Sequence, residues 1–300
     1  MAAPSQTWEE MWGPSRDRRL AIFQTLYDGS LSASEAGDQL VEASLADDNP
    51  GLTINLLLKA ARERPEQHDK LVNVLLHVVK LAHPTGADGQ PTQSQETRLS
   101  DALPFLGMVL NETWNGLTVP LSPPEARQKD VQRFINVNRL CAKLMTTKYS
   151  FFNYSMFALW TFRAALETTV KQSSPRHSPP EAFIPAAAAW IEILGEEIFT
   201  WDEEFEHGPA ARSRPGRGGP LCPEKHNFDR ERWDLWRDRF REVAQDDEED
   251  VDERVRDAAR KAQRRMAEIQ QMPPRPELGD MDLPDERPGT GRWHGSMYKA

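Results

Sequence analysis

Two polar side chains lie on helix faces that are otherwise apolar, and together with a nearby acid their types suit them to binding a ligand. Asn138 lies within the apolar face of a helix predicted over residues 125–148, and Arg163 shares a face with apolar residues of the next helix, 151–170. A buried arginine needs a partner, and Glu167, one turn later, is the nearest. The arrangement predicts either a polar pocket for a small molecule or a satisfied cluster that fixes helix packing, and we favour the cluster.

Cysteine and histidine, the usual nucleophiles and metal ligands, are not spaced for either task. Cys141 belongs to an apolar helix face, where a thiol is inert, and Cys222 lies in a loop with no histidine beside it in sequence. His68, His77 and His83 follow no metal-ligand spacing, and charged neighbours on its helix face place His77 in solvent. We therefore predict no catalytic residues, no metal site and no cofactor, and the sequence favours a protein without enzymatic activity.

Two basic clusters are candidates for nucleic-acid contacts. Arg212, Arg214 and Arg217 lie among glycines, as in RNA-binding segments, but without aromatic residues, and a flexible surface loop explains them equally well. The second cluster consists of Arg260, Lys261, Arg264 and Arg265. It follows a block of acids and is typical of a helix face that pairs with them. The net charge of −10, from 47 acidic and 37 basic residues, also argues against phosphate binding.

The elements that must position these residues are helices, because apolar residues recur at helical spacing and no segment alternates as a strand would. Helices are predicted over residues 15–27, 32–46, 52–63, 66–82, 98–114, 125–148, 151–170, 182–201, 229–244 and 247–271. We expect an all-α fold without a sheet, with about ten helices packed as an irregular, orthogonal array. One domain is expected over residues 1–271, followed by a Pro-, Asp- and Gly-rich, disordered tail at 272–300.

Several predicted helix ends carry local signals. Ser32, with Glu35 three residues later, forms a capping-box pattern, and Gly29 is predicted to stop the helix before it. The acids of residues 246–253 precede basic residues further along the last helix, a polarity that matches the helix dipole.

Large aromatic side chains in the C-terminal third define a candidate core. The helix over residues 182–201 has an alanine-rich face that permits close helix approach, and the helix over 229–244 has an aromatic stripe at i, i+3 and i+7. We expect the stripe to pack against the alanine-rich face as core, rather than to form an aromatic box for a ligand. This core signature consists of Trp190, Gly195, Trp233, Trp236 and Phe240.

The same region resembles a known family. The run AAAAWI at residues 186–191 and the RWxxW motif of Arg232, Trp233 and Trp236 are similar to those of DUF3632, a family of fungal proteins described as a domain of unknown function. The resemblance extends over about residues 12–266. It implies an α-helical intracellular domain and carries over no catalytic residues.

The N-terminal residues lack the apolar run of a secretory signal, and no stretch is apolar enough for a transmembrane helix. Two cysteines cannot build a disulfide framework, so we expect an intracellular protein, cytoplasmic or nuclear, away from membranes. We predict a non-enzymatic helical interaction or scaffold protein whose partners are other proteins. A small-molecule-binding or catalytic protein with a pocket near Asn138 and Arg163 is the alternative, and a nucleic-acid-associated regulator is a weaker one. A deep cleft at Arg163 would favour the pocket, whereas a filled core with a surface groove would favour the interaction protein.

Overall fold

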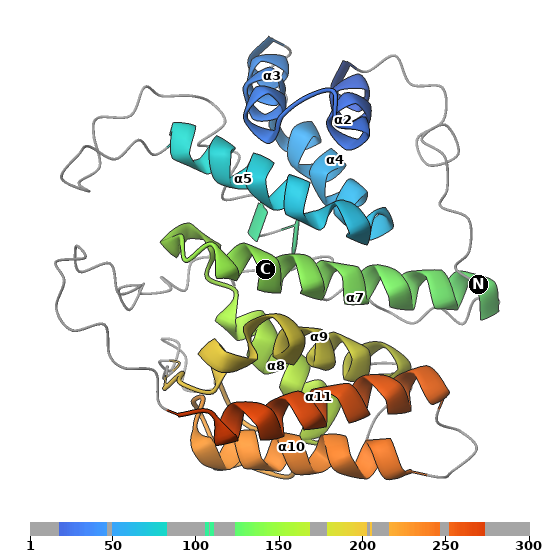
Figure 1. Cartoon of the computed structure of the whole chain (residues 1–300), viewed down its shortest axis with the longest axis vertical. Helices are drawn as coiled ribbons and strands as arrows, with labels where there is room; N and C mark the ends of the chain where they lie inside the picture. Colours follow the sequence, from blue (N-terminus) through green and yellow to red (C-terminus); the bar gives the residue numbers. More distant parts are fainter. Residues whose placement is uncertain are drawn as a thin grey trace, which may run out of the picture. The chain divides into compact units, whose positions relative to one another are not determined.

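The computed structural model describes residues 18–46, 50–82, 106–107, 109–110, 124–168, 179–202, 205, 216–246 and 252–273. Every regular element in these residues is helical, which confirms the all-α prediction (Figure 1). The chain divides into two compact units, Met1–Glu112 and Thr113–Ala300. One domain over residues 1–271 therefore stays a prediction, and the expected tail lies, beyond Pro273, outside the described residues. None of the helices described is long and apolar enough to cross a membrane.

The N-terminal unit contains four helices that match the predicted ones within about three residues at each end. They are α2 (Arg18–Asp28), α3 (Ala33–Ala46), α4 (Pro50–Glu63) and α5 (His68–Ala82), with a 3-10 turn at Pro65–Gln67 before α5. Their apolar stripes form a core in which Phe23, Leu40 and Val79 have no exposed surface. Most of the helix predicted over residues 98–114 lies outside the described residues.

The signals at the junction of α2 and α3 act as predicted. The Ser32 N–H donates to Glu35 Oε2 at 2.9 Å, and the Glu35 N–H donates to Ser32 Oγ at 3.2 Å, which confirms the capping box. The Ser32 hydroxyl also donates to the Glu35 carboxylate and holds its pKa below the ordinary value. Gly29 ends α2 with φ +85°, a left-handed conformation that favours glycine.

His77 is at the surface as expected but only partly exposed, because α3 packs against one side of its ring and leaves 28% of the side chain accessible. Its Nε2 lies 2.8 Å from Asp38 Oδ1, and its ring packs on Gly37 so closely that a Cβ there would lie 2.7 Å from His77 Cδ2. The charged neighbours of His77 on α5 indicated an exposed face, but they carried no information about the helix packed across it.

The C-terminal unit is built around one helix that is buried on almost every side. Its elements are α7 (Pro124–Thr146), a 3-10 turn at Ser150–Phe152, α8 (Ser155–Leu166), α9 (Pro180–Ile198), α10 (Arg230–Gln245) and α11 (Glu253–Gln271). The central helix, α9, packs against α7, α8 and α11, while α10 lies along α11 (Figure 1). Because α9 is apolar around its circumference, it is stable only when it is enclosed in this way.

Ion pairs between helices fix the direction of α7 relative to α9. Arg127 pairs with Glu181 near the start of both helices, and Arg139 pairs with Glu192 about three turns later. Arg265 of α11 pairs with Glu196 at the same end of α9 as Glu192. The two pairs between α7 and α9 show that these helices run parallel with a nearly constant offset.

The aromatic stripe of α10 packs on a different partner from the one expected. Trp236 stacks on Phe162 of α8, with ring centroids 4.4 Å apart and an interplanar angle of 17°, and Trp233 contacts Phe199, just beyond α9. The alanine-rich face of α9 is occupied by α7 and α11 instead, because its small side chains admit whole helices.

The five residues of the core signature are buried all the same. Trp190, Trp233, Trp236 and Phe240 are at most 2% exposed. Gly195 lets α11 approach α9 so closely that a Cβ on it would lie 2.7 Å from Ile269 Cδ1. We infer that these residues support the fold rather than form a ligand box.

The last helix begins later than expected. Asp252 caps it by accepting a hydrogen bond from the Arg254 N–H at 2.9 Å, so α11 starts at Glu253 rather than at residue 247. Residues 247–251 lie outside the described residues.

Candidate functional site

Asn138 joins three helices through its side chain. Its Oδ1 accepts hydrogen bonds from Thr161 Oγ1 of α8 and from Trp190 Nε1 of α9, both at 2.9 Å. Its Nδ2 donates to the Phe134 carbonyl at 3.0 Å. Asn138, Thr161 and Trp190 are all fully buried, so this amide is held by the protein and its oxygen has no free lone pair for a ligand.

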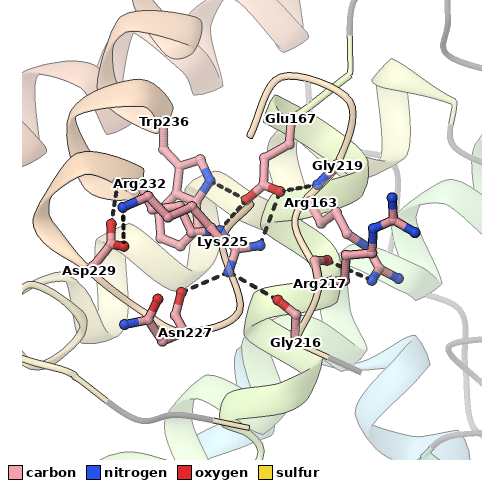
Figure 2. A network of polar contacts seen from close by, with 10 residues as sticks. All are labelled: Arg163, Glu167, Gly216, Arg217, Gly219, Lys225, Asn227, Asp229, Arg232 and Trp236. Atoms are coloured by element: carbon pink, nitrogen blue, oxygen red, sulfur yellow. Dashed lines mark hydrogen bonds and ion pairs between the residues drawn. The ribbon is translucent and has the colours of Figure 1, made fainter. Parts of the chain in front are cut away.

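Glu167 follows α8 directly and forms a second, separate network (Figure 2). Its side chain has no exposed surface, and its carboxylate accepts four hydrogen bonds. Arg232 donates two of them, from Nε at 2.8 Å and from Nη2 at 3.1 Å. Trp236 Nε1 donates at 2.9 Å and the Gly219 N–H at 2.7 Å. The partner predicted from the sequence was Arg163, whereas Arg232 makes the bidentate pair.

Arg232 uses its remaining donor group on the backbone of the loop that precedes α10. Its Nη1 donates to the Asn227 carbonyl at 2.7 Å and to the Gly216 carbonyl at 3.3 Å. Asp229 caps α10 by accepting from the Arg232 N–H at 2.7 Å (Figure 2). The network therefore ties the end of α8 and the start of α10 to one loop, and buried charges with so many partners serve to define the structure.

The glycines of that loop permit its close approach to Glu167. A Cβ at Gly219 would lie 2.7 Å from the Glu167 carbonyl oxygen, and one at Gly218 would lie 2.0 Å from the Cys222 carbonyl oxygen. A Cβ at Gly216 would lie 2.3 Å from the backbone of His226. The described part of the Arg-Gly segment is thus packed, and the interpretation as a flexible surface loop does not hold there.

Arg163 contacts this loop from its outer side. Its Nη1 donates to the Arg217 carbonyl at 3.1 Å (Figure 2). Burial lowers the pKa of Arg163, and the nearby Glu167 carboxylate opposes that shift. The structure thus brings Arg163 and Glu167 near each other, as the spacing predicts, but Asn138 hydrogen-bonds within a different cluster.

One signal in the sequence pointed to the true partner of Glu167. Arg232 lies one turn before Trp236 on the same face of α10, and its guanidinium carbon is 5.8 Å from the centre of the Trp236 ring. A basic residue inside an apolar stripe needs a buried partner. The same reasoning that singled out Arg163 applies to Arg232, which was missed.

The two cysteines are thiols suited to packing. Burial raises the pKa of Cys141 far above its ordinary value. Cys222 is half-buried, and burial together with the Glu167 carboxylate raises the pKa of its thiol to about 12. Neither sulfur is activated as a nucleophile, because that requires a lowered pKa.

The comparison with family models decides the relationship of this chain to known proteins. The model of DUF3632, described as a protein of unknown function, matches residues 55–240. The chain belongs to the DUF3632 family. Searches of curated proteins and of solved structures gave no match. The matched region contains every side chain that binds Glu167 and ends at Phe240, within α10.

In this DUF3632 protein, a groove with a volume of about 1020 Å³ lies between α7, α9 and α11. Half of its apolar lining residues are alanines: Ala188, Ala189, Ala258 and Ala262. The others are Val131, Ile135, Pro185 and Val255. None of the residues predicted for a polar pocket or for the core lines this α7–α9–α11 groove, but Lys261 and Arg265 of the second basic cluster do. The groove itself exists only where three helices from separate parts of the chain come together.

The acids that line the groove are all engaged within the protein. Glu181 binds Arg127, and Glu192 accepts two hydrogen bonds from Arg139, at 2.7 and 2.8 Å. Asp257 pairs with Arg260, and Asp252 caps α11.

More basic than acidic side chains line the groove. Arg254 and Lys261 both line the groove, and neither forms an ion pair within the part of the chain that the structure describes. Arg139, Lys261 and Lys143 together hold the pKa of Glu192 below its ordinary value. The end of the groove near Glu192 therefore carries excess positive charge, although the whole chain is acidic.

Proposed function

We propose that this protein is an intracellular, non-enzymatic interaction module whose α7–α9–α11 groove binds an acidic, apolar segment of a partner protein. The proposal rests on one observation. The groove has an apolar floor rich in alanine, its acids are engaged within the protein, and two of its cations, Arg254 and Lys261, form no ion pair within the described residues. Between Arg127 and Arg139, α7 extends about 18 Å, enough for about five or six extended residues or three helical turns.

The chemistry of the groove selects the kind of segment. Small residues such as Ala188 and Ala258 leave room for larger apolar side chains of a partner, whose burial is worth about 25 cal/mol per Å². Lys261 and Arg254 can each form an ion pair with a carboxylate of the partner. Such pairs add specificity and speed association. Peptide recognition in grooves between helices is a common mode of protein interaction.

The two alternative functions have less support. A small-molecule site near Asn138 and Arg163 would need polar atoms that are free to meet a ligand, and the Asn138 amide is engaged in the core. Nucleic-acid binding would need a broad unpaired basic patch, but two of the four cations of the second cluster are paired, Arg260 with Asp257 and Arg265 with Glu196.

Paired variants on α11 test the proposal. Ala258→Arg fills the groove and Lys261→Glu reverses its free charge, whereas Ala267→Arg and Arg264→Glu make the same changes on α11 outside the groove. We expect affinity purification of the full chain to recover partners with wild type and with both controls, and to lose them with both groove variants.

A photo-crosslinking residue in place of Gln128, an exposed residue at the rim of the groove, then identifies the bound segment, which should be acidic and apolar. Partners retained equally by the groove variants and the controls would refute the proposal, as would a crosslinked segment that is basic.

A further inference from the structure

The sequence that follows α11 has the composition that the groove selects. Residues 277–286 read ELGDMDLPDE, with no basic residue. The acids are Glu277, Asp280, Asp282, Asp285 and Glu286, and the apolar side chains between them are Leu278, Met281 and Leu283. We propose that this segment binds in the α7–α9–α11 groove of its own molecule and competes there with the partner protein. The inference rests on the proposed function, because it requires the groove to be a peptide-binding site.

Charge complementarity favours this occupant. The cations at the Glu192 end of the groove are Arg139, Lys261 and Arg265. Arg139 and Arg265 already bind acids of α9, so Lys261 remains for an incoming carboxylate, as does Arg254 further along the groove. An acidic segment meets an attractive local potential there, although the whole chain has a net charge of −10.

The connection is long enough for the segment to reach the groove. Arg265 lies six residues before the end of α11 at Gln271, a distance of about 9 Å along the helix. The seven residues from Gln271 to Leu278 span at most about 25 Å when extended, so the chain can turn back along α11. It would then enter the groove at the end with excess positive charge.

The length of the segment also matches the groove. Residues 278–283 span about 20 Å when extended, against about 18 Å for the groove along α7. In an extended segment, alternate side chains point to opposite sides, so Met281 and Leu283 share one side and Asp280 and Asp282 share the other. Such a segment presents Met281 and Leu283 to the alanines, and the Asp280 and Asp282 carboxylates, together with Leu278, to the rim.

A tethered occupant regulates access to the groove. A segment joined by a short connection has an effective concentration of about 1 mM, so an intrinsic Kd of about 0.1 mM would keep the groove mostly filled. A partner would then bind about tenfold more weakly to the full chain than to a variant whose segment cannot dock.

Photo-crosslinking in the full chain tests the inference. With benzoylphenylalanine in place of Met281, we expect crosslinks to α7, α9 or α11 residues of the groove, mapped by mass spectrometry. Ala258→Arg should lower their yield about tenfold, and Ala267→Arg should leave it unchanged. Leu283→Ser should lower the yield as well, since the acids alone cannot hold the segment.

Three results would overturn the inference: crosslinks spread over other surfaces, a yield that is insensitive to Ala258→Arg, or links between molecules in a mixture of isotopically light and heavy chains. Partner capture in the same variants separates this inference from the proposed function. If partners are lost with Ala258→Arg while the segment gives no groove crosslinks, only the regulatory inference fails. If the segment crosslinks and no partner depends on the groove, the groove serves the segment alone and the proposed function fails.

Discussion

Glu167 and Arg232 show how single residues can stabilise several elements at once. Each side chain is almost completely buried. Together they join the end of α8, the start of α10 and the loop that precedes α10. A buried pair of this kind contributes little net stability compared with apolar residues, but leaving either charge alone is costly. Its value lies in specifying one arrangement of the loop.

The first prediction follows from that asymmetry. Glu167→Gln leaves the Arg232 guanidinium without a counter-charge and should lower the free energy of unfolding by about 3–5 kcal/mol, measured by urea denaturation with tryptophan fluorescence. The double variant with Arg232→Met should recover part of the loss, since both charges are then gone. A loss below about 1 kcal/mol in the single variant would show that the pair is not structurally important.

The second prediction concerns pH and the Glu192 side chain, which is largely exposed. Hydrogen bonds from Arg139 hold the pKa of Glu192 below its ordinary value of 4.5 in the folded protein. A lowered pKa in the folded state means that this pair stabilises the protein above about pH 4.5 and that the contribution is lost as the pH falls through the lowered pKa.

With screening by solvent, we expect Glu192→Gln to cost less than about 1 kcal/mol at pH 7. The difference from wild type should shrink as the pH falls below about 4.5, as measured by urea midpoints at pH 7 and at a series of acid pH values. A difference that grows on acidification would contradict the assignment.

At the scale of elements, the loop before α10 is held by close backbone contacts rather than by regular structure. Gly218 and Gly219 lie where a Cβ would strike backbone atoms, which cannot rotate away as a side chain can. The loop is therefore a specified part of the fold, in contrast to the usual variability of loops.

The third prediction tests this packing. Gly219→Ala should destabilise the protein by about 1–3 kcal/mol, because the added Cβ would lie 2.7 Å from the Glu167 carbonyl oxygen. Gly107→Ala is the matched control, since nothing lies within 4 Å of a Cβ there, and it should be neutral or slightly stabilising. Thermal unfolding of both variants measures the difference, and equal melting temperatures would contradict the packing.

The fourth prediction concerns the aromatic stripe of α10. Trp233 is 2% exposed and contacts Phe199, so Trp233→Ala should cost about 3–5 kcal/mol through lost burial and the cavity left behind. The free energy of unfolding measures this loss. An undiminished melting temperature would refute the assignment of Trp233 to the core.

At the scale of the whole molecule, the distribution of charge matters more than its sum. The chain has a net charge of −10, yet the unpaired side chains of the α7–α9–α11 groove are cationic. Bulk charge predicts repulsion of an acidic partner, whereas the local field of the groove predicts attraction.

The fifth prediction decides between these two fields. Raising the salt concentration from about 0.05 M to about 0.5 M shortens the screening length several-fold and should weaken retention of the partner by the full chain. Arg264→Glu should retain this salt dependence, because Arg264 does not line the groove. Stronger retention at high salt would show that the bulk charge dominates.

The amino-acid sequence alone determined what depends on near neighbours in the chain. The helices, the Ser32–Glu35 capping box, the stop at Gly29 and the burial of Trp236 follow from spacing over a few residues, because helical periodicity and capping are local interactions. The need of Arg163 for a partner was also evident from the apolar residues that share its helix face, whereas the same need of Arg232 was missed.

Only the tertiary structure decided which partners those groups found. It paired Glu167 with Arg232 across 65 residues of sequence, placed His77 against Asp38 of α3, and aligned α7, α9 and α11 into a groove. Each of these contacts depends on the relative placement of whole helices, which many distant packing contacts fix together and which no single stretch of sequence encodes.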